Sequence, residues 1–134
     1  MPETIQTVKT FLDREWLATL ATVNAKNEPR AVPVFFTYDD GKMYVQTDRT
    51  SVKVRNLQKN CHVAVTVYCG EEAVVINGTA RIVDDEEFVT RTQEHIAKYG
   101  LRLDEQGKDS MGIPLFDSKV RCVVEISPKR TIFW

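Results

Sequence analysis

The chain opens with an amphipathic pattern and then changes to segments rich in threonine and valine. Ile5, Val8, Phe11 and Leu12 recur at helical spacing behind Thr4, a candidate N-cap, which predicts a short helix. Beyond this helix the composition favours strands. We predict strands over residues 17–23, 31–37, 43–46, 63–68, 74–83 and 120–126.

The strand assignment is clearest where apolar and other residues alternate, over 63–68 and 120–126. One face of each strand should therefore meet solvent or a ligand. Over 17–23 the pattern is ambiguous, because Leu17, Leu20 and Val23 also suit one face of a helix. The threonine content and the turn after residue 23 favour a strand there.

Turn residues separate several of these strands. They lie at 24–29, at Asp39-Asp40-Gly41 and at Cys69-Gly70-Glu71, as expected for hairpins between sequential antiparallel strands. Two further helices are predicted, over 51–59 and over 85–99. Residues 101–119 form a polar stretch that is long for a plain connection, so a lid, an interface arm and a loose insert all remain open.

The composition limits the class of protein. The 134 residues suit one domain, 1–134, and the charge of -1 with 43% hydrophobic residues indicates neither disorder nor a nucleic-acid partner. No apolar run is long enough to span a bilayer, and the first residues do not form a signal peptide. We therefore expect a protein of the cytoplasm with no membrane association.

The cysteines and histidines do not form a recognisable site. Cys61, Cys69 and Cys122 form no CxxC and lie in or beside apolar runs, so buried free thiols are expected, with a redox-active pair as the alternative. His62 and His95 are isolated from each other. No transition-metal site is expected.

Hydroxyl and basic residues join a strand end to a helix start over 47–57. Backbone N–H groups at a helix N-terminus attract an anion, the hydroxyls of Thr50 and Ser51 can donate to it, and Lys53 adds positive charge. This is a phosphate site in outline. The plainer interpretation is that Ser51 is only an N-cap, with Lys53 and Arg55 on a solvated face, and spacing alone favours it.

A second candidate is the strand over 29–36, which carries Arg30 and an internal proline, Pro33. Proline cannot donate to a strand ladder, so one side of this strand is expected to be unpaired and open to the edge of a flat heteroaromatic ligand. The alternative is an edge strand on which Pro33 guards against aggregation.

Together with the order of the strands, these segments are similar to a known family. The chain resembles the pyridoxamine 5'-phosphate oxidase-like FMN-binding split-barrel proteins over 17–23, 29–36, 41–47 and 51–60, closely in the first two-thirds and loosely in the rest. The resemblance implies a mainly β fold, a six-stranded antiparallel split β-barrel with short flanking helices. It also implies a homodimer with FMN bound at the subunit interface.

The resemblance implies a set of cofactor-binding residues as well. These line the flavin from the second strand, lie near the flavin and ribityl chain on the third, and contact the phosphate: Arg30, Ala31, Val32 and Pro33, then Gln46 and Thr47, then Ser51 and Lys53. True pyridoxamine phosphate oxidases carry a basic residue where this chain has Val52, for which Arg49 or Arg55 would have to compensate. A family glutamine falls near Ala73, and the part that holds the vitamin B6 phosphate has no counterpart, so pyridoxamine phosphate oxidation is disfavoured.

The resemblance points to an FMN-dependent oxidoreductase that passes electrons or hydride between FMN and an unidentified small partner. No general acid, nucleophile or other catalytic residue is identifiable. One alternative is a reductase that uses the deazaflavin F420, and another is a non-catalytic flavin or haem carrier or sensor, with His62 as the candidate haem ligand. Trp134 either stacks near the flavin of the partner subunit or fills the dimer seam.

Overall fold

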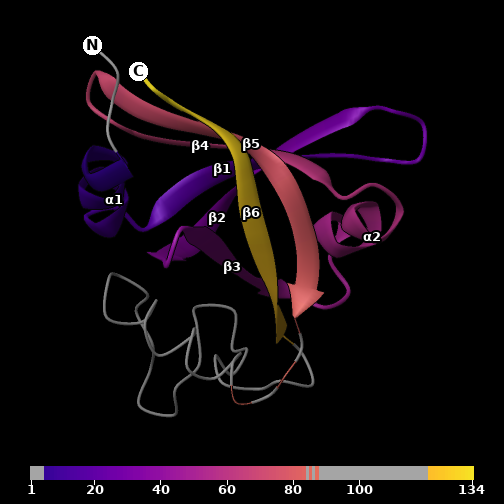
Figure 1. Cartoon of the computed structure of the whole chain (residues 1–134). Coiled ribbons are helices and arrows are strands. Elements are labelled where there is room, and N and C mark those ends of the chain that lie inside the picture. The colour runs from indigo at the N-terminus through magenta and orange to yellow at the C-terminus, as the bar shows by residue number, and fades with distance from the viewer. Residues whose placement is uncertain (1–4, 84, 86, 88–120) are drawn as a thin grey trace.

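A computed structural model describes residues 5–83, 85, 87 and 121–134 of the chain. The elements in this part are α1 (Ile5–Asp13), β1 (Leu17–Val23), β2 (Pro29–Asp39), β3 (Lys42–Asp48), α2 (Val52–Lys59), β4 (His62–Cys69), β5 (Glu72–Val83) and β6 (Arg121–Phe133). The strands form a closed antiparallel barrel in the order β1-β2-β3-β6-β5-β4 (Figure 1). The predicted fold class is confirmed.

Local turn chemistry explains why neighbouring strands pair in sequence. Between β2 and β3, Asp40 and Gly41 both have positive φ angles, of 50° and 78°, as the turn of a two-residue hairpin requires. Between β1 and β2, the side-chain oxygen of Asn24 accepts hydrogen bonds from the backbone N–H groups of Lys26 and Glu28, each at 2.9 Å. That side chain fixes the bend of the longer loop.

The last strand extends beyond its predicted end. We expected it to finish at residue 126, but β6 continues to Phe133 because β5 supplies partners from Val123 to Phe133. Pairing of β6 with β3 ends at Ile126, so the residues beyond it, including Pro128, pair with β5 alone among the described strands. A proline is tolerated there because one side of the strand no longer needs a donor.

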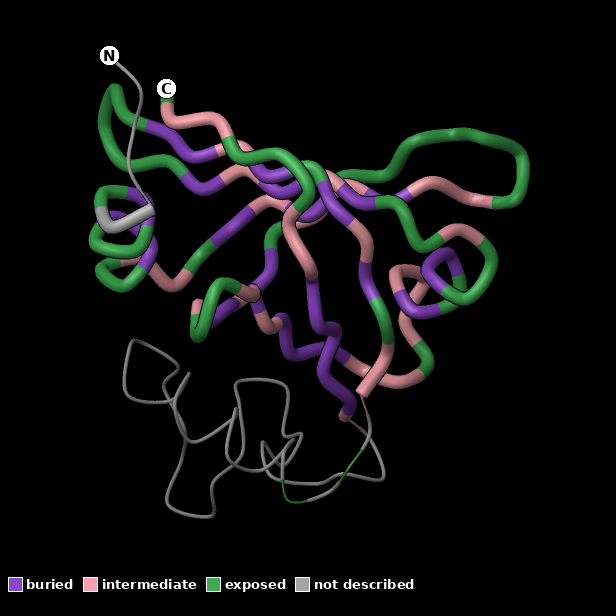
Figure 2. Tube along the Cα trace, viewed as in Figure 1, coloured by how far each residue is buried: buried purple, intermediate pink, exposed green. Residues whose placement is uncertain are grey.

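The core fills the barrel and is closed at one end by α1. The largest fully buried side chains include Phe11, Leu20, Phe36 and Met43. Phe11 of α1 meets the ring of Phe133 edge-on, with centroids 5.5 Å apart. The buried positions run along the strands, and the hairpin loops and the outer side of α1 are exposed (Figure 2).

The prediction of buried free thiols is correct for one of the three cysteines. The thiol of Cys122 is buried as predicted, but Cys61 and Cys69 are exposed, because they lie immediately before β4 and at its end. The predicted helix over 85–99 and the stretch over 101–119 lie outside the described residues. Among the helices that the structure describes, none is both long and apolar enough to cross a membrane.

Candidate anion and cofactor site

The site begins with a split between two strands of the barrel. Residues 29–35 of β2 pair with β1, and the β2–β3 ladder starts only at Phe36, opposite Val45. Beyond Val45, β3 pairs with β6, from Gln46 to Asp48. Among the described strands, the 29–35 edge of β2 that faces away from β1 therefore has no partner, as predicted from Pro33.

This split explains why the two predicted strand segments belong together. Arg30 and Pro33 lie on β2 on one side of the split, and Gln46 and Thr47 follow the last paired residue of β3 on the other. Arg30, Ala31 and Pro33 are exposed, and Val32 is half-buried. A ligand at the split would meet the backbone of one strand and the side chains of the other.

Helix α2 starts directly after the β3 side of the split. Ser51 is its N-cap, with an extended backbone, and its Oγ accepts a hydrogen bond from the backbone N–H of Val54 at 3.4 Å. The Oγ1 of Thr47 lies 3.3 Å from the Ser51 Oγ. Two hydroxyls thus lie at the positive end of a helix, where an anion is stabilised by free N–H groups and by the dipole.

The ammonium group of Lys53, in the first turn of α2, is influenced by charges from other elements. Burial lowers the pKa of the half-buried Lys53 ammonium from its ordinary value, and the positive charge of Arg30 lowers this pKa further. The carboxylate of Asp48 acts in the opposite direction and only partly offsets them. A bound anion would reverse this shift, because it favours the charged form of Lys53.

The packing of α2 explains why Lys53 faces the part of the barrel that carries Arg30. The buried side chain of Asn56 donates a hydrogen bond to the Thr22 Oγ1 of β1 at 3.1 Å. Thr22 is the direct partner of Arg30 in the β1–β2 ladder. Because Lys53 and Asn56 are three residues apart and share a face of the helix, this hydrogen bond holds Lys53 on the side of Arg30.

Gln46 has an unusual environment for an amide side chain. It is only 7% exposed, and neither its Oε1 nor its Nε2 has a hydrogen-bond partner within the described part of the chain. A buried amide without partners costs free energy, so such groups are uncommon unless a ligand or water satisfies them. The residue fits a cofactor that offers both a donor and an acceptor.

Thr22 and Asn56 were not predicted as site residues, since no local signal connects a strand threonine to a helix asparagine. Tyr68 was not predicted as a site residue either; it is exposed, on the face of β4 that faces away from the core. Of the two residues considered as substitutes for the basic residue absent at Val52, Arg55 is exposed and Arg49 is half-buried. No group of three or more metal-ligating side chains occurs among the residues described.

A six-stranded antiparallel barrel, with a split between β2 and β3 beside the start of α2, is the class of fold that this geometry defines. The family model for pyridoxamine 5'-phosphate oxidase matches residues 4–134, and the chain belongs to this family. The recognition made from the sequence is therefore confirmed. A comparison with functionally curated proteins gives no match.

Solved structures share the fold. A conserved hypothetical protein from Mycobacterium tuberculosis superimposes with a TM-score of 0.82 at 23% identity, covering 100% of this chain and 86% of that one. An F420 reductase gives 0.77 at 20% identity, covering 98% of both chains. General Stress Protein 26 from Bacillus anthracis gives 0.69 at 22% identity, covering 93% and 89%.

Proposed function

We propose that this protein binds FMN as a homodimer and passes electrons or hydride between FMN and a small partner. The observation that carries the proposal is the start of α2, where the hydroxyl oxygens of Thr47 and Ser51 lie 3.3 Å apart at the helix N-terminus and the half-buried Lys53 follows in the first turn. Burial and the charge of Arg30 disfavour the charged form of Lys53 in the ligand-free protein, and a phosphate group at the helix start would favour it.

The remaining predicted residues extend the site from the phosphate toward a flat ring. In this proposal Ala31, Val32 and Pro33 line the flavin along the unpaired edge of β2, and the buried amide of Gln46 makes hydrogen bonds to the cofactor. Bound FMN supplies the redox chemistry. The protein's own groups anchor it and orient it.

An uncharged outer face supports the homodimer. Directly paired residues share a face of the sheet, so Ala31, Ala21 and Ala64 form one row across β2, β1 and β4, with Pro33 and Thr19 beside it. These small side chains leave a flat surface without charge, which a second copy can cover. Light scattering should give the mass of a dimer for the native protein and that of a monomer for Ala64→Arg. A native protein that is monomeric and still binds FMN with full affinity would contradict an FMN site at the subunit interface.

Cofactor identity is tested directly on the protein as expressed. Its visible spectrum is recorded, and any cofactor released on denaturation is identified by mass. Recovery of FMN supports the proposal, whereas a colourless protein that fails to bind added FMN excludes it. Photoreduction followed by exposure to oxygen or other acceptors then separates an oxidoreductase from a passive carrier.

The role of Lys53 is tested by comparing two ligands that differ only in the phosphate. Lys53→Ala should weaken FMN by about 10- to 100-fold, the loss expected for a charged hydrogen bond, and should leave riboflavin unchanged. Lys59→Ala is the matched control, because Lys59 lies in the last turn of the same helix. Equal losses for FMN and riboflavin would refute the phosphate contact.

F420 is the second candidate cofactor, favoured by the structural match to an F420 reductase along nearly the whole of both chains. The same basic residues would then hold its phosphate or acidic tail. Mass analysis of the released cofactor distinguishes the two, and so does a direct titration of the cofactor-free protein with each.

A further inference from the structure

Helix α2 carries positive charge on its outer side. Residues 49–59 include four basic residues and no acidic one, and because the whole chain has a formal charge of -1, the rest of the chain carries -5. The exposed residues of α2 are Arg55, Gln58 and Lys59, and the opposite side of the helix is buried against the barrel. The outer side of α2 is therefore polar and basic.

Further cations lie at the same end of the barrel. Lys26 and Arg30 are exposed on the β1–β2 hairpin, which lies on the same side of the barrel as α2 (Figure 1). Two carboxylates belong to this region, Glu28 and Asp48, and the Asp48 Oδ1 lies 3.7 Å from the Nη1 of Arg121. The net charge here stays positive. We call the following residues the basic end: Lys26, Arg30, Arg49, Lys53, Arg55 and Lys59.

The opposite end of the barrel carries negative charge. It includes α1 and the β4–β5 hairpin, which lie on the other side of the barrel from α2 (Figure 1). The pKa of the Lys9 ammonium is raised by its hydrogen bond to Asp13, by the charge of Asp13 and also by that of Asp39, so carboxylates of α1 and of the β2–β3 turn act together. The exposed carboxylates at this end are Asp13, Asp39, Asp40, Glu71 and Glu72.

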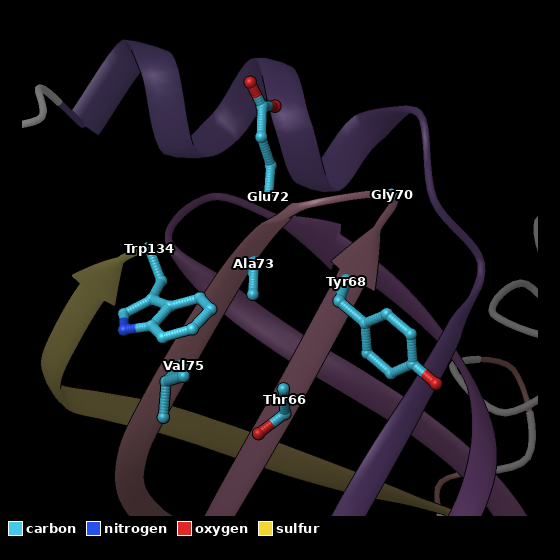
Figure 3. A pocket seen from close by; sticks show the side chains of 7 residues that line it. All are labelled: Thr66, Tyr68, Gly70, Glu72, Ala73, Val75 and Trp134. Carbon is cyan, nitrogen blue, oxygen red and sulfur yellow. The ribbon is translucent and has the colours of Figure 1, made fainter.

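The side chain of Glu72 adds to the charge of this acidic end and not to the outer face of the sheet. Glu72 lies at the rim of a pocket that Tyr68 and Trp134 also line, and its side chain points away from both rings (Figure 3). The two ends of the barrel therefore differ in sign. Such a charge distribution orients an approaching charged molecule before contact is made.

The basic end is wider than a single anionic group. Helix α2 has eight residues and is therefore roughly 12 Å long, and Lys26 lies on a different element. A phosphate at the helix start engages Lys53 but leaves Arg55 and Lys59 on the outer side. A protein surface with several carboxylates can contact all of them. A nucleic acid fits less well, because its charge continues past the basic end toward a chain that is otherwise acidic.

The chemistry of this surface favours a transient complex. Stable interfaces have an apolar centre, whereas weak redox complexes are small and depend on complementary charge. None of the exposed residues of α2 is apolar. An acidic protein would therefore associate quickly with the basic end and leave again.

We propose that the basic end docks a small acidic electron-carrier protein. This inference rests on the proposed function, because the candidate cofactor site begins at the same helix, with Ser51 and Lys53. The carrier is oxidised by one electron in each encounter, so two encounters and two protons from the solvent reduce one bound FMN. The small partner of the proposed function is then the electron acceptor.

The test is calorimetric titration of the full-length protein as purified with a plant-type ferredoxin, a small acidic carrier, and with cytochrome c, a small basic one. Ferredoxin should bind at low ionic strength and cytochrome c should not. The double variant Arg55→Gln/Lys59→Gln should weaken ferredoxin by about three- to tenfold and leave FMN affinity unchanged. Binding should be lost at about 1 M salt, where charges are screened within about 3 Å. Lys9→Gln, at the acidic end, is the matched control and should bind ferredoxin like the native protein.

Several results would overturn the proposal. Ferredoxin that does not bind, that binds the double variant equally well, or that stays bound at high salt would each exclude docking through these charges. Assemblies larger than a dimer that form at low salt in light scattering, and that the double variant does not form, would make the acidic end of a second copy the occupant. A single-stranded oligonucleotide that binds more tightly than ferredoxin would make a nucleic acid the occupant.

Failure of this inference is distinguishable from failure of the proposed function. A protein that binds FMN but not ferredoxin would contradict only the docking of an electron carrier. A protein that binds ferredoxin but not FMN would contradict the proposed function, and the electron-transfer role with it.

Discussion

The amide nitrogen of Asn56 lies 3.1 Å from the hydroxyl oxygen of Thr22, and this buried hydrogen bond attaches α2 to β1. It is the contact that carries Lys53 to the side of Arg30, because Thr22 and Arg30 are direct partners in the β1–β2 ladder. A hydrogen bond inside the protein thereby sets the geometry of the candidate anion site.

Thr22→Val should lower the free energy of unfolding by about 1–3 kcal/mol, because it leaves the buried Asn56 amide without its partner. FMN affinity should fall as well, since α2 loses its anchor. The double variant Thr22→Val/Asn56→Leu removes both polar groups and should recover part of the stability. Urea denaturation measures all three proteins, and a double variant whose loss equals the sum of the single losses would contradict the coupling.

Gln46→Met should raise the stability of the cofactor-free protein by up to about 1–3 kcal/mol, because it removes a buried amide that has no partner in the described structure. The same change should weaken FMN binding, since the cofactor loses a donor and an acceptor. Urea denaturation and FMN titration measure the two effects. Gln58→Met, at an exposed position on α2, is the control and should change neither. A destabilised Gln46→Met protein would show that the amide already has a partner.

The environment of Glu125 predicts that the stability of the fold depends on pH. This buried carboxylate accepts a hydrogen bond from the Arg81 Nε at 2.7 Å, and the bond, aided by Lys42, lowers its pKa below the ordinary value of 4.5. A carboxylate whose pKa is lower in the folded than in the unfolded state stabilises the fold. This stabilisation is complete above the pKa of the unfolded state and is lost as the pH falls through the pKa of the folded state.

Native protein should therefore melt at a higher temperature than Glu125→Gln at pH 7, and this difference should shrink as the pH falls below about 4.5. Thermal unfolding over a pH series measures it. Glu28→Gln, at an exposed position in the β1–β2 loop, serves as the control. A difference that is the same at pH 7 and at acid pH would show that Glu125 stabilises the fold through packing and not through its charge.

Gly78 predicts a strict requirement for glycine at a bulge between β5 and β6. A Cβ at this position would lie 2.3 Å from the carbonyl oxygen of Ser127 and 3.1 Å from the Cα of Pro128, both of them backbone atoms. Gly78→Ala should therefore cost about 2 kcal/mol or more in the free energy of unfolding. Denaturant unfolding measures this loss.

Gly70→Asn is the matched control for Gly78→Ala. Gly70 has a positive φ angle of 63°, but a Cβ added there would have nothing within 4 Å, and asparagine tolerates that backbone conformation. Gly70→Asn should therefore lower the free energy of unfolding by less than about 1 kcal/mol. Similar losses for the two variants would show that the sheet can shift to accommodate a side chain at position 78.

The sequence by itself determined the elements whose signals are local. Alternating valines predict β4, the Asp40-Gly41 turn predicts the β2–β3 hairpin, and Ser51 before an apolar pattern predicts the start of α2. These signals are readable because turns and caps depend on residues only a few positions apart. The end of β6 was not predictable in this way, because its polar residues become a strand only beside β5.

Only the tertiary structure decided how the separate parts of the candidate site meet. The sequence marks Thr50-Ser51-Val52-Lys53 as an outline of a phosphate site, and the fold adds Arg30 through the pairing of Thr22 with β2. It also leaves Gln46 buried without a partner in the described part of the chain and brings Trp134 to Tyr68 across β5. Such contacts depend on strand register and on where the barrel splits, and these are properties of the closed sheet that no short segment carries.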